Sequence, residues 1–380
     1  MDFTFTAEQK LLKENVERFI ANEYSFDKRR AWVQSEAGFS HENWAKFGKL
    51  GWLGVGVAEE YGGLGGSAVE QAILMEVFGR GLVVEPYLTT AVLGTALLHH
   101  GGSVQQKQGL LPTIAAGESL IAFAFSERQS RYSLRDVTTT ARKDDEGFVL
   151  NGTKSVVFDA ASADIVVVSV RTEGANRDEH GISLFLVERQ TPGLALREYA
   201  TVDGRRAAEL SLNDVRVSAD AVLGTLDNTL PVIKRVIDAG IVAVCAEAVG
   251  IMAALCETTL DYLKTRQQFG RPIGEFQVLQ HRMVDMYVAC ELSRSMAYMA
   301  AVKLDDAEVT ERRCAVSAAK VQIGRAGRFI GQQAVQLHGA MGMTDELAVG
   351  HYFKRLTMID STFGDMDYHL QRFALECRMT

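Results

Sequence analysis

Arg266 and the loop that follows it have the residue types of a phosphate site. The arginine is expected at the end of a helix, and Gly270, Pro272 and Gly274 give the following loop a fixed turn geometry. An exposed guanidinium there offers the planar pattern of donors that suits a pyrophosphate group. An arginine that only caps the helix C-terminus would produce the same pattern, so both interpretations stay open.

A second segment, near residue 340, allows a close approach to the backbone. Gly339 and Gly342 lack a Cβ atom, so a ligand or another chain can lie directly against the main chain there. A plain turn that ends a helix is the alternative explanation of the same two glycines. The eight histidines have no spacing that suits a metal ion, and we expect no metal site.

Composition places the chain among ordinary globular proteins. Its 380 residues allow two or three domains, with 47% hydrophobic and 23% charged residues. The net charge of -8 argues against a nucleic-acid binder. The N-terminus lacks the pattern of a secretory signal, and no apolar run reaches the length of a membrane span, so we expect a cytoplasmic protein. Five cysteines in apolar helical contexts are predicted to be reduced core residues: Cys245, Cys256, Cys290, Cys314 and Cys377.

Periodicity divides the chain into three segments. We predict an N-terminal helical domain over residues 1–118, a middle β domain over 119–225 and a C-terminal helical bundle over 226–380. The fold class is α+β and mainly helical, with a β-barrel or sandwich in the middle and a four-helix bundle at the end. The clearest strand is 208–217, where apolar and polar residues alternate, and the clearest core helix is 231–266. The next helix is expected to bury one apolar stripe made of Leu279, Met283, Met286, Tyr287 and Cys290.

Four segments, in this order along the chain, resemble the acyl-CoA dehydrogenase family. The resemblance extends over essentially the whole chain, and the shared order and spacing make it far more specific than any single motif. The matching segments are LGWLG at 50–54 with EEYGG at 59–63, Glu76 and Gly79-Arg80; LNGTK at 150–154; TRQQFGRPIG at 265–274 with Phe276 and Gln277; and QLHGAMG at 336–342.

This resemblance implies an FAD site shared between two subunits. The family holds one FAD with the arginine at the position of Arg266 and with the glycine segment of a neighbouring subunit, at the positions of Gly339 and Gly342. The other cofactor contacts that it implies are polar ones from Gln277, Gln336 and Ser126 and a packing contact from Phe269.

The implied reaction is α,β-desaturation of an acyl-CoA thioester. A carboxylate removes the α-proton while a hydride passes from the β-carbon to the flavin. This chemistry needs a base of raised pKa in a dry pocket. An electron-transfer flavoprotein is the expected electron acceptor.

The catalytic base is the main departure from the family. The usual base is a glutamate followed by Gly, Thr and Ser just before the last helix, whereas this chain has Phe363, Gly364 and Asp365 in that region. Counting without gaps from Gln336 places Phe363 at the base position, and anchoring on residues 371–372 places Asp365 there. Asp365 is therefore a candidate base, with capping of the last helix as the alternative.

A second base position used by some family members, on the helix before Arg266, is also altered. Alignment on residues 249–250 puts Gly240 there. Glu247 lies roughly two helical turns further along and is the second catalytic candidate. A buried carboxylate or a polar contact between subunits are the alternatives for Glu247.

The part of the flavin site that belongs to the middle domain is eroded too. The segment that begins at Ser126 lacks the Gly and Pro turn chemistry of the family, and the strand after residues 150–154 lacks its Trp and its Ser or Thr. Retained interface residues beside an altered active site favour a subunit that works with a catalytically intact paralogue. Residues 349–355 and 363–365 are similar to the small subunits of pimeloyl-CoA dehydrogenase-type enzymes, and to heterotetrameric dehydrogenases that act on steroid side-chain thioesters.

Three alternatives remain open. The chain could be a self-sufficient homotetramer with Asp365 as the base. It could be a non-catalytic subunit that completes the FAD site of a paralogue. It could also be a flavin oxidase or monooxygenase on the same fold.

Overall fold

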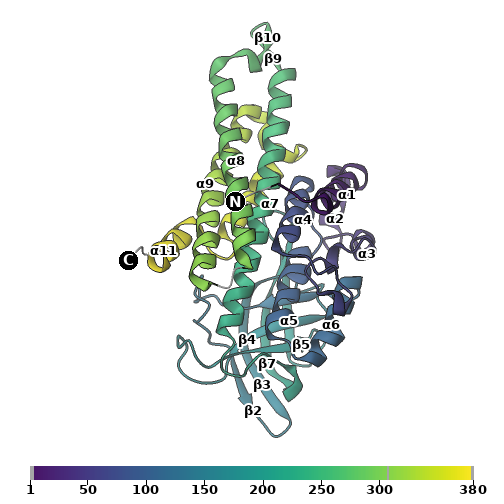
Figure 1. Cartoon of the computed structure of the whole chain (residues 1–380), viewed down its shortest axis with the longest axis vertical. Helices are drawn as coiled ribbons and strands as arrows, with labels where there is room; N and C mark the ends of the chain where they lie inside the picture. Colours follow the sequence, from purple (N-terminus) through teal and green to yellow (C-terminus); the bar gives the residue numbers. More distant parts are fainter. Residues whose placement is uncertain (1–3, 306–307, 378–380) are drawn as a thin grey trace. The chain divides into compact units, whose positions relative to one another are not determined.

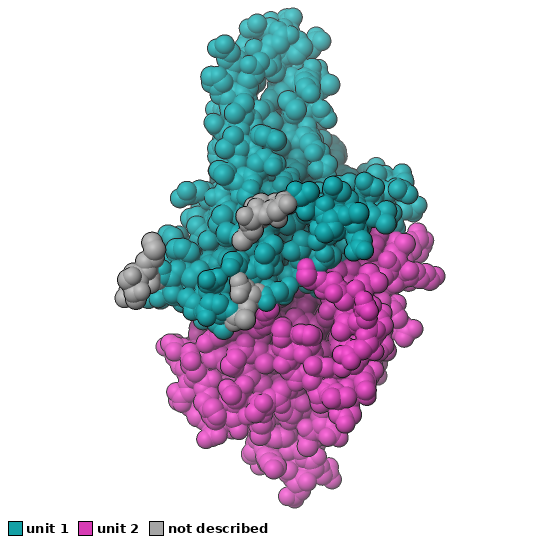
Figure 2. Space-filling view, in the orientation of Figure 1, with its two compact units in different colours: residues 1–31, 68–83, 241–380 teal, residues 32–67, 84–240 magenta. Residues whose placement is uncertain are grey.

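The computed structural model describes residues 4–305 and 308–377, which fold into two compact units (Figures 1 and 2). Unit 1 is made of residues 1–31, 68–83 and 241–380, and unit 2 of residues 32–67 and 84–240. Each unit therefore combines segments that are far apart in the sequence. The division into three domains along the chain stays a prediction.

Short helices make up the first part of unit 2. Two of them begin at residues that satisfy free amides, because the Ser40 hydroxyl accepts from the Asn43 amide, and Ser103 and Gln106 form a capping box. Gly117 adopts a left-handed conformation and ends the last helix. The elements are α3 (His41–Lys49), η1 (Trp52–Gly54), η2 (Glu59–Tyr61), η3 (Leu88–Gly94), α5 (Thr95–Gly101) and α6 (Val104–Ala116).

The second part of unit 2 is one eight-stranded mixed sheet. Its strands are β1 (Ile121–Ala124), β2 (Thr140–Lys143), β3 (Gly147–Phe158), β4 (Ile165–Arg171), β5 (Ile182–Glu188), β6 (Leu194–Ala200), β7 (Arg206–Ser218) and β8 (Val222–Leu223). The hydrogen-bonded order is β6-β7-β3-β2-β4-β5-β8, with β1 parallel to β4 and β3 antiparallel to β7. Among the described residues this path is open, so the closed barrel that we predicted is not shown.

The strand predicted from alternation at 208–217 is confirmed as part of β7. Leu210, Leu212 and Val215 are buried in the core of the sheet, and Asn213 is exposed. The alternation skips one residue at Asp214, whose φ is 51°, and the pairing with β3 changes register at the same place.

Unit 1 is helical apart from one short hairpin. Its elements are α1 (Ala7–Glu23), α4 (Ala68–Gly81), the hairpin of β9 (Gln267–Gln268) and β10 (Arg271–Pro272), η5 (Ile273–Glu275), α8 (Gln277–Leu304), α9 (Val309–His338), η6 (Gly339–Met343), α10 (Ala348–Ser361) and α11 (Met366–Glu376). Two further helices, α2 (Phe26–Gln34) and α7 (Leu230–Thr265), contribute residues to both units. The helix predicted at 231–266 is confirmed as α7.

The apolar character of α7 comes from its place in the core. An 18-residue window of this helix has a mean hydropathy of 2.2, which is apolar enough for a membrane span by length and composition. However, 94% of that window is buried inside the folded chain. A helix that is apolar on most faces is typical of a protein interior.

Two glycines allow α4 and α7 to cross closely within unit 1. A Cβ atom on Gly250 would lie 1.8 Å from the Glu76 carbonyl oxygen, and one on Gly79 would lie 2.0 Å from the Glu247 carbonyl oxygen. The contact is reciprocal, because each glycine lies three residues after a glutamate of its own helix and meets the backbone of the glutamate in the other. Only glycine permits so close an approach of two helix backbones.

The apolar stripe predicted for α8 is wrong at one position. Met286 and Cys290 are buried, and Leu279 and Met283 are half-buried, but Tyr287 is 61% exposed. Successive residues of a helix point about 100° apart, so Tyr287 lies at the edge of the stripe and can face solvent while Met286 is buried.

The prediction that all five cysteines are reduced is also wrong. Cys314 on α9 forms a disulfide with Cys377, the residue after α11. Their sequence separation of 63 residues hides this proximity from any reading of local pattern. Three cysteines match the prediction, being buried and free: Cys245, Cys256 and Cys290.

Candidate cofactor and catalytic site

The hairpin between α7 and α8 presents Arg266 to solvent. Its amide donates to the Tyr262 carbonyl (2.8 Å), and its carbonyl accepts from the Ile273 amide (2.9 Å). Phe269 and Gly270 have φ values of 56° and 79°, which the tight turn requires. The backbone of Arg266 is thus held at both ends of the hairpin, while its side chain is exposed.

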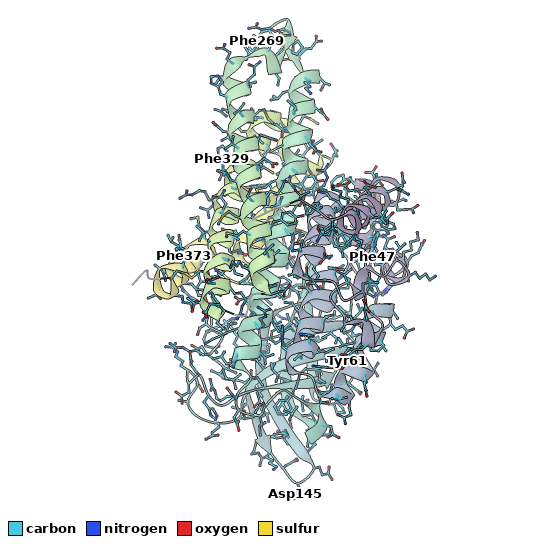
Figure 3. The ribbon with its side chains drawn as sticks, viewed as in Figure 1. Phe47, Tyr61, Asp145, Phe269, Phe329 and Phe373 are labelled. Carbon is cyan, nitrogen blue, oxygen red and sulfur yellow. A yellow bond between two sulfur atoms is a disulfide. The ribbon has the colours of Figure 1, made fainter. Side chains whose placement is uncertain are left out.

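The polar side chains of unit 1 that are predicted to contact a cofactor have no partner in the described part of their own chain. Arg266, Gln277 and Gln336 are exposed, and their side chains make no hydrogen bond or ion pair with residues 4–305 or 308–377. Phe269 is 92% exposed at the outer end of the hairpin (Figure 3). An unpaired guanidinium close in sequence to an exposed aromatic ring is typical of a site that another molecule completes.

The two glycines near residue 340 differ in role. A Cβ atom on Gly339 would meet nothing within 4 Å, although its φ of 57° and ψ of -139° disfavour any other residue. A Cβ atom on Gly342 would lie 2.6 Å from the Val335 carbonyl oxygen, so this glycine is required by the packing of its own chain. Gly339 alone leaves open space beside the backbone.

Stacked rings bring the glycine segment and the end of α7 together. The ring of His338, the last residue of α9, lies 4.5 Å from that of Tyr262, one turn before Arg266. Burial lowers the pKa of His338, which favours a neutral ring. The predicted cofactor residues of unit 1 therefore gather at one end of the bundle.

Ser126 lies in unit 2, two residues after the end of β1, where its carbonyl accepts from the Ser155 amide (2.8 Å). The next residue, Glu127, accepts from the Lys154 ammonium (2.7 Å) and from the Thr139 hydroxyl (2.7 Å). Burial alone would raise the pKa of Glu127, but the charge and hydrogen bond of Lys154, with further bonds from Thr138 and Gln129, lower it to about 2. The Ser126 segment is therefore held rigidly although it lacks the family's turn residues.

This ion pair gives a structural role to the segment at 150–154. Lys154 is fully buried, and burial lowers its pKa to about 8 against the opposing charge of Glu127. The sequence of residues 150–154 resembles a family segment but does not indicate this pairing, because Glu127 and Lys154 are 27 residues apart.

An open pocket lies beside the same segment of unit 2. It has a volume of about 600 Å³ and is lined by Gln129, Asp136, Thr138, Ala175, Asn176 and Arg177. Arg177 donates to the Asp136 carboxylate at 2.8 Å.

Glu247, the second catalytic candidate, is bound on both carboxylate oxygens by one arginine. The Nε and Nη2 atoms of Arg355 on α10 each donate to it at 2.7 Å, and the side chains are 1% and 5% exposed. This geometry is the strongest form of an arginine–carboxylate pair. Among the alternatives for Glu247, the buried carboxylate is confirmed, and a role in catalysis stays a prediction.

Asp365, the first catalytic candidate, is the N-cap of α11. Its side chain accepts from the Tyr368 amide at 2.8 Å. The capping interpretation is thus confirmed, while its role as a base stays a prediction. Phe363, at the base position in the ungapped alignment, is 9% exposed and carries no titratable group.

Comparison with protein families matches nearly the whole chain. Three family profiles are found in order: "Acyl-CoA dehydrogenase, N-terminal domain" over residues 6–118, "middle domain" over 122–215 and "C-terminal domain" over 230–375. A similar curated protein is the probable acyl-CoA dehydrogenase YngJ of Bacillus subtilis, which is 30% identical over 99% of this chain and 98% of that one.

Two solved structures are similar over nearly their full length. The ChsE4-ChsE5 complex from Mycobacterium tuberculosis has 26% identity and a TM-score of 0.90, with 100% of each chain covered. PigA with FAD and proline has 26% identity and a TM-score of 0.91, with 99% of each chain covered.

Proposed function

We propose that this chain, which belongs to the acyl-CoA dehydrogenase family, is one subunit of a heteromeric enzyme that desaturates an acyl-CoA thioester between its α and β carbons. The chain is an oxidoreductase of this family, and FAD is its cofactor. In this enzyme, cofactor binding and proton removal would be shared between this chain and a paralogous partner.

The observation that carries the proposal is the contrast between free and engaged candidate residues. Arg266, Gln277 and Gln336 have no side-chain partner among residues 4–305 and 308–377. Glu247 is bound on both oxygens by Arg355, and Asp365 caps a helix. The residues suited to a shared cofactor are thus available, and the two carboxylates suited to proton removal are not.

The free residues fit an FAD. The guanidinium of Arg266 has the fork that binds a pyrophosphate on two oxygens, and the exposed ring of Phe269 can pack on a flat group. The open space beside Gly339 lets a ligand approach its backbone. When bound, the flavin accepts the hydride that leaves the β-carbon.

The residues of this chain would then bind and orient. Arg266 would neutralise the pyrophosphate, and the amides of Gln277 and Gln336 would donate to the cofactor's polar atoms. The hydroxyl of Ser126, on a segment held by the Glu127–Lys154 pair, would add a hydrogen bond. The base that removes the α-proton would come from the partner, because neither Glu247 nor Asp365 is free of structural contacts.

The similarity to the ChsE4-ChsE5 complex supports a heteromer, since that structure contains two different chains by its own description. By the same reasoning we propose a paralogous dehydrogenase as partner. From the resemblance to the family, we also propose an electron-transfer flavoprotein as electron acceptor, and the sequence favours the cytoplasm as the location. Similarity of residues 349–355 and 363–365 to heteromeric dehydrogenases favours a dicarboxylic or steroid side-chain thioester as substrate.

Purification of the chain alone and with its paralogue tests the proposal. We expect a colourless or aggregating protein alone, and a yellow complex that acyl-CoA reduces when both chains are co-expressed. A yellow homo-oligomer that acyl-CoA reduces without a partner would contradict the proposal and support Asp365 as the base.

One substitution separates a contributing subunit from a scaffold. With a base in the partner, Asp365→Asn should leave turnover of the complex within about twofold, because an asparagine also caps a helix. A loss of turnover with unchanged FAD content would place the base in this chain.

A further inference from the structure

Lys320 on α9 is a buried cation without a carboxylate in contact. Its side chain is fully buried, and its ammonium forms no salt bridge within the part of the chain that the structure describes. Instead, it donates to the main-chain oxygens of Asp360 (2.8 Å) and Gly364 (2.6 Å). A buried ammonium is costly unless its donors are used, so these two bonds are the reason that it can stay charged.

Those two oxygens lie at either side of the turn between α10 and α11. Asp360 belongs to the last turn of α10, where carbonyls lack partners within the helix and a nearby cation is favoured. Gly364 directly precedes the N-cap of α11. One ammonium therefore joins the end of one helix to the beginning of the next.

The turn itself needs such support. Phe363 has a φ of 61°, in the left-handed region that an aromatic residue rarely adopts, and Gly364 has a φ of 113°. A Cβ atom on Gly364 would lie 2.4 Å from the Tyr368 ring and 2.8 Å from the His369 ring, so only glycine fits there. A backbone held in these conformations persists only where its surroundings fix it.

His369 on α11 contacts a third carbonyl oxygen of the turn. Its Nε2 lies 3.1 Å from the Phe363 carbonyl oxygen, to which it must donate, and its Nδ1 lies 3.4 Å from the Ser317 hydroxyl. Ser317 lies three residues before Lys320, about one turn along α9. Lys320 thus binds two carbonyl oxygens of the turn directly. Ser317, one turn earlier on α9, contacts His369, which binds the third.

We propose that Lys320 is a positioning residue: by holding the carbonyls of Asp360 and Gly364, it fixes the turn at residues 360–365 and thereby the position of the side chains at 363 and 365. The charged and titratable groups around it are Cys245 on α7, Asp360 on α10, and Asp365 and His369 on α11. The expected result for turnover rests on the proposed function, because the reaction takes place only in the dehydrogenase complex.

Amide hydrogen exchange tests the positioning itself, without any assay of activity. In Lys320→Met, which keeps the length of the side chain and removes its donors, the amides of Tyr368 and His369 should exchange at least about tenfold faster. The matched control is Lys354→Met, because Lys354 is 43% exposed and its contact with Asp345 is 3.8 Å. Unchanged exchange at 368–369 in Lys320→Met would overturn the proposal.

Kinetics of the flavin-loaded complex then tests the consequence. With the base in the partner, we expect kcat, KM and FAD content of Lys320→Met to stay within about twofold, because the side chains at 363 and 365 then take no part in proton removal. Faster exchange together with a roughly tenfold lower kcat and unchanged FAD content would instead place the base in this turn and contradict the proposed function. A complex without flavin in every variant would instead contradict the proposed function and leave the exchange result valid.

A milder variant covers the case in which Lys320→Met does not fold. Lys320→Gln shortens the side chain and replaces the ammonium with a neutral amide, so that it can no longer bind both carbonyls. It should raise exchange at residues 368–369 above that of the unsubstituted chain. Unchanged exchange in this variant would also overturn the proposal.

Discussion

Two regions of the helical unit 1, the hairpin after α7 and the crossing of α4 and α7, place charged residues in opposite environments. At the hairpin, Arg266 is exposed and unpaired among the described residues, and Phe269 is 92% exposed. Around the crossing of α4 and α7, Glu247 and Arg355 are buried and bound to each other. The difference teaches that a charged residue within a family segment indicates a ligand only where its own chain leaves it without a partner.

Removal of one member of the buried pair should give the largest effect. Arg355→Met leaves the Glu247 carboxylate buried without its two donors, and we expect a loss of about 3–5 kcal/mol in the free energy of unfolding. Urea denaturation of the single and double variants measures it. The double variant Glu247→Leu/Arg355→Met should recover most of the loss, and a double variant as unstable as the single one would contradict this explanation.

Substitution at the helix crossing should have the second largest effect. Gly250→Ala places a methyl group against the Glu76 carbonyl, so α4 and α7 must separate, at a cost of about 1–3 kcal/mol. The control is Gly109→Ala on α6, where a Cβ atom meets nothing within 4 Å and alanine should be neutral or slightly stabilising. Equal stability of the two variants would show that the crossing tolerates a side chain.

Low pH should destabilise the turn before α11 more than it destabilises the hairpin of β9 and β10. Burial, with the nearby charges of Lys320 and Arg372, lowers the pKa of His369 to about 3. The folded state thus binds the proton less readily than the unfolded state, whose histidine titrates near 6.5. Stability from His369 is therefore complete above pH 6.5 and is lost as the pH falls toward 3, by up to about 1.4 kcal/mol per pH unit.

The His369→Gln variant isolates this contribution. Glutamine does not titrate, so the slope of unfolding free energy against pH between 6.5 and 3 should be shallower than in the unsubstituted chain. Parallel slopes would mean that His369 takes up its proton as readily in the folded chain as in the unfolded one.

The hairpin should show the smallest effect on stability and a clear effect on assembly. Phe269→Ser removes a ring that is 92% exposed, and we expect less than about 0.5 kcal/mol of change in unfolding free energy. FAD retention and co-purification of the paralogue should nevertheless fall. Leu11→Ser, at a 58% exposed position on α1 in the same unit, is the control that should change neither property.

Local pattern predicted the elements well and their long-range contacts poorly. The core helix α7, the strand at 208–217 and the cap at Asp365 were readable, because each depends on residues within a few positions of one another. The partner of Glu247 lies 108 residues away, so its burial could not be read from its neighbours. One missed signal was available: α4 and α7 both carry a glutamate three residues before a glycine, and these are the residues that meet.

The wrong prediction at Tyr287 and the closed barrel, which is not shown, have a common physical cause. Tyr287 follows the helical spacing of the apolar stripe, but spacing alone does not say how far the buried face extends around the helix, and exposed apolar residues are normal on protein surfaces. The number and spacing of the strands indicate that strands exist and leave their pairing open. Pairing is a tertiary property, decided by contacts between distant segments.

Because Cys314 and Cys377 form a disulfide, the stability of the folded chain depends on whether the medium is oxidising or reducing. The disulfide closes a loop across a separation of 63 residues, and a cross-link of that span removes entropy from the unfolded chain worth roughly 4 kcal/mol. A thiol reductant added during purification would reduce this disulfide and so remove the restraint on the unfolded chain. The same protein would then melt at a lower temperature.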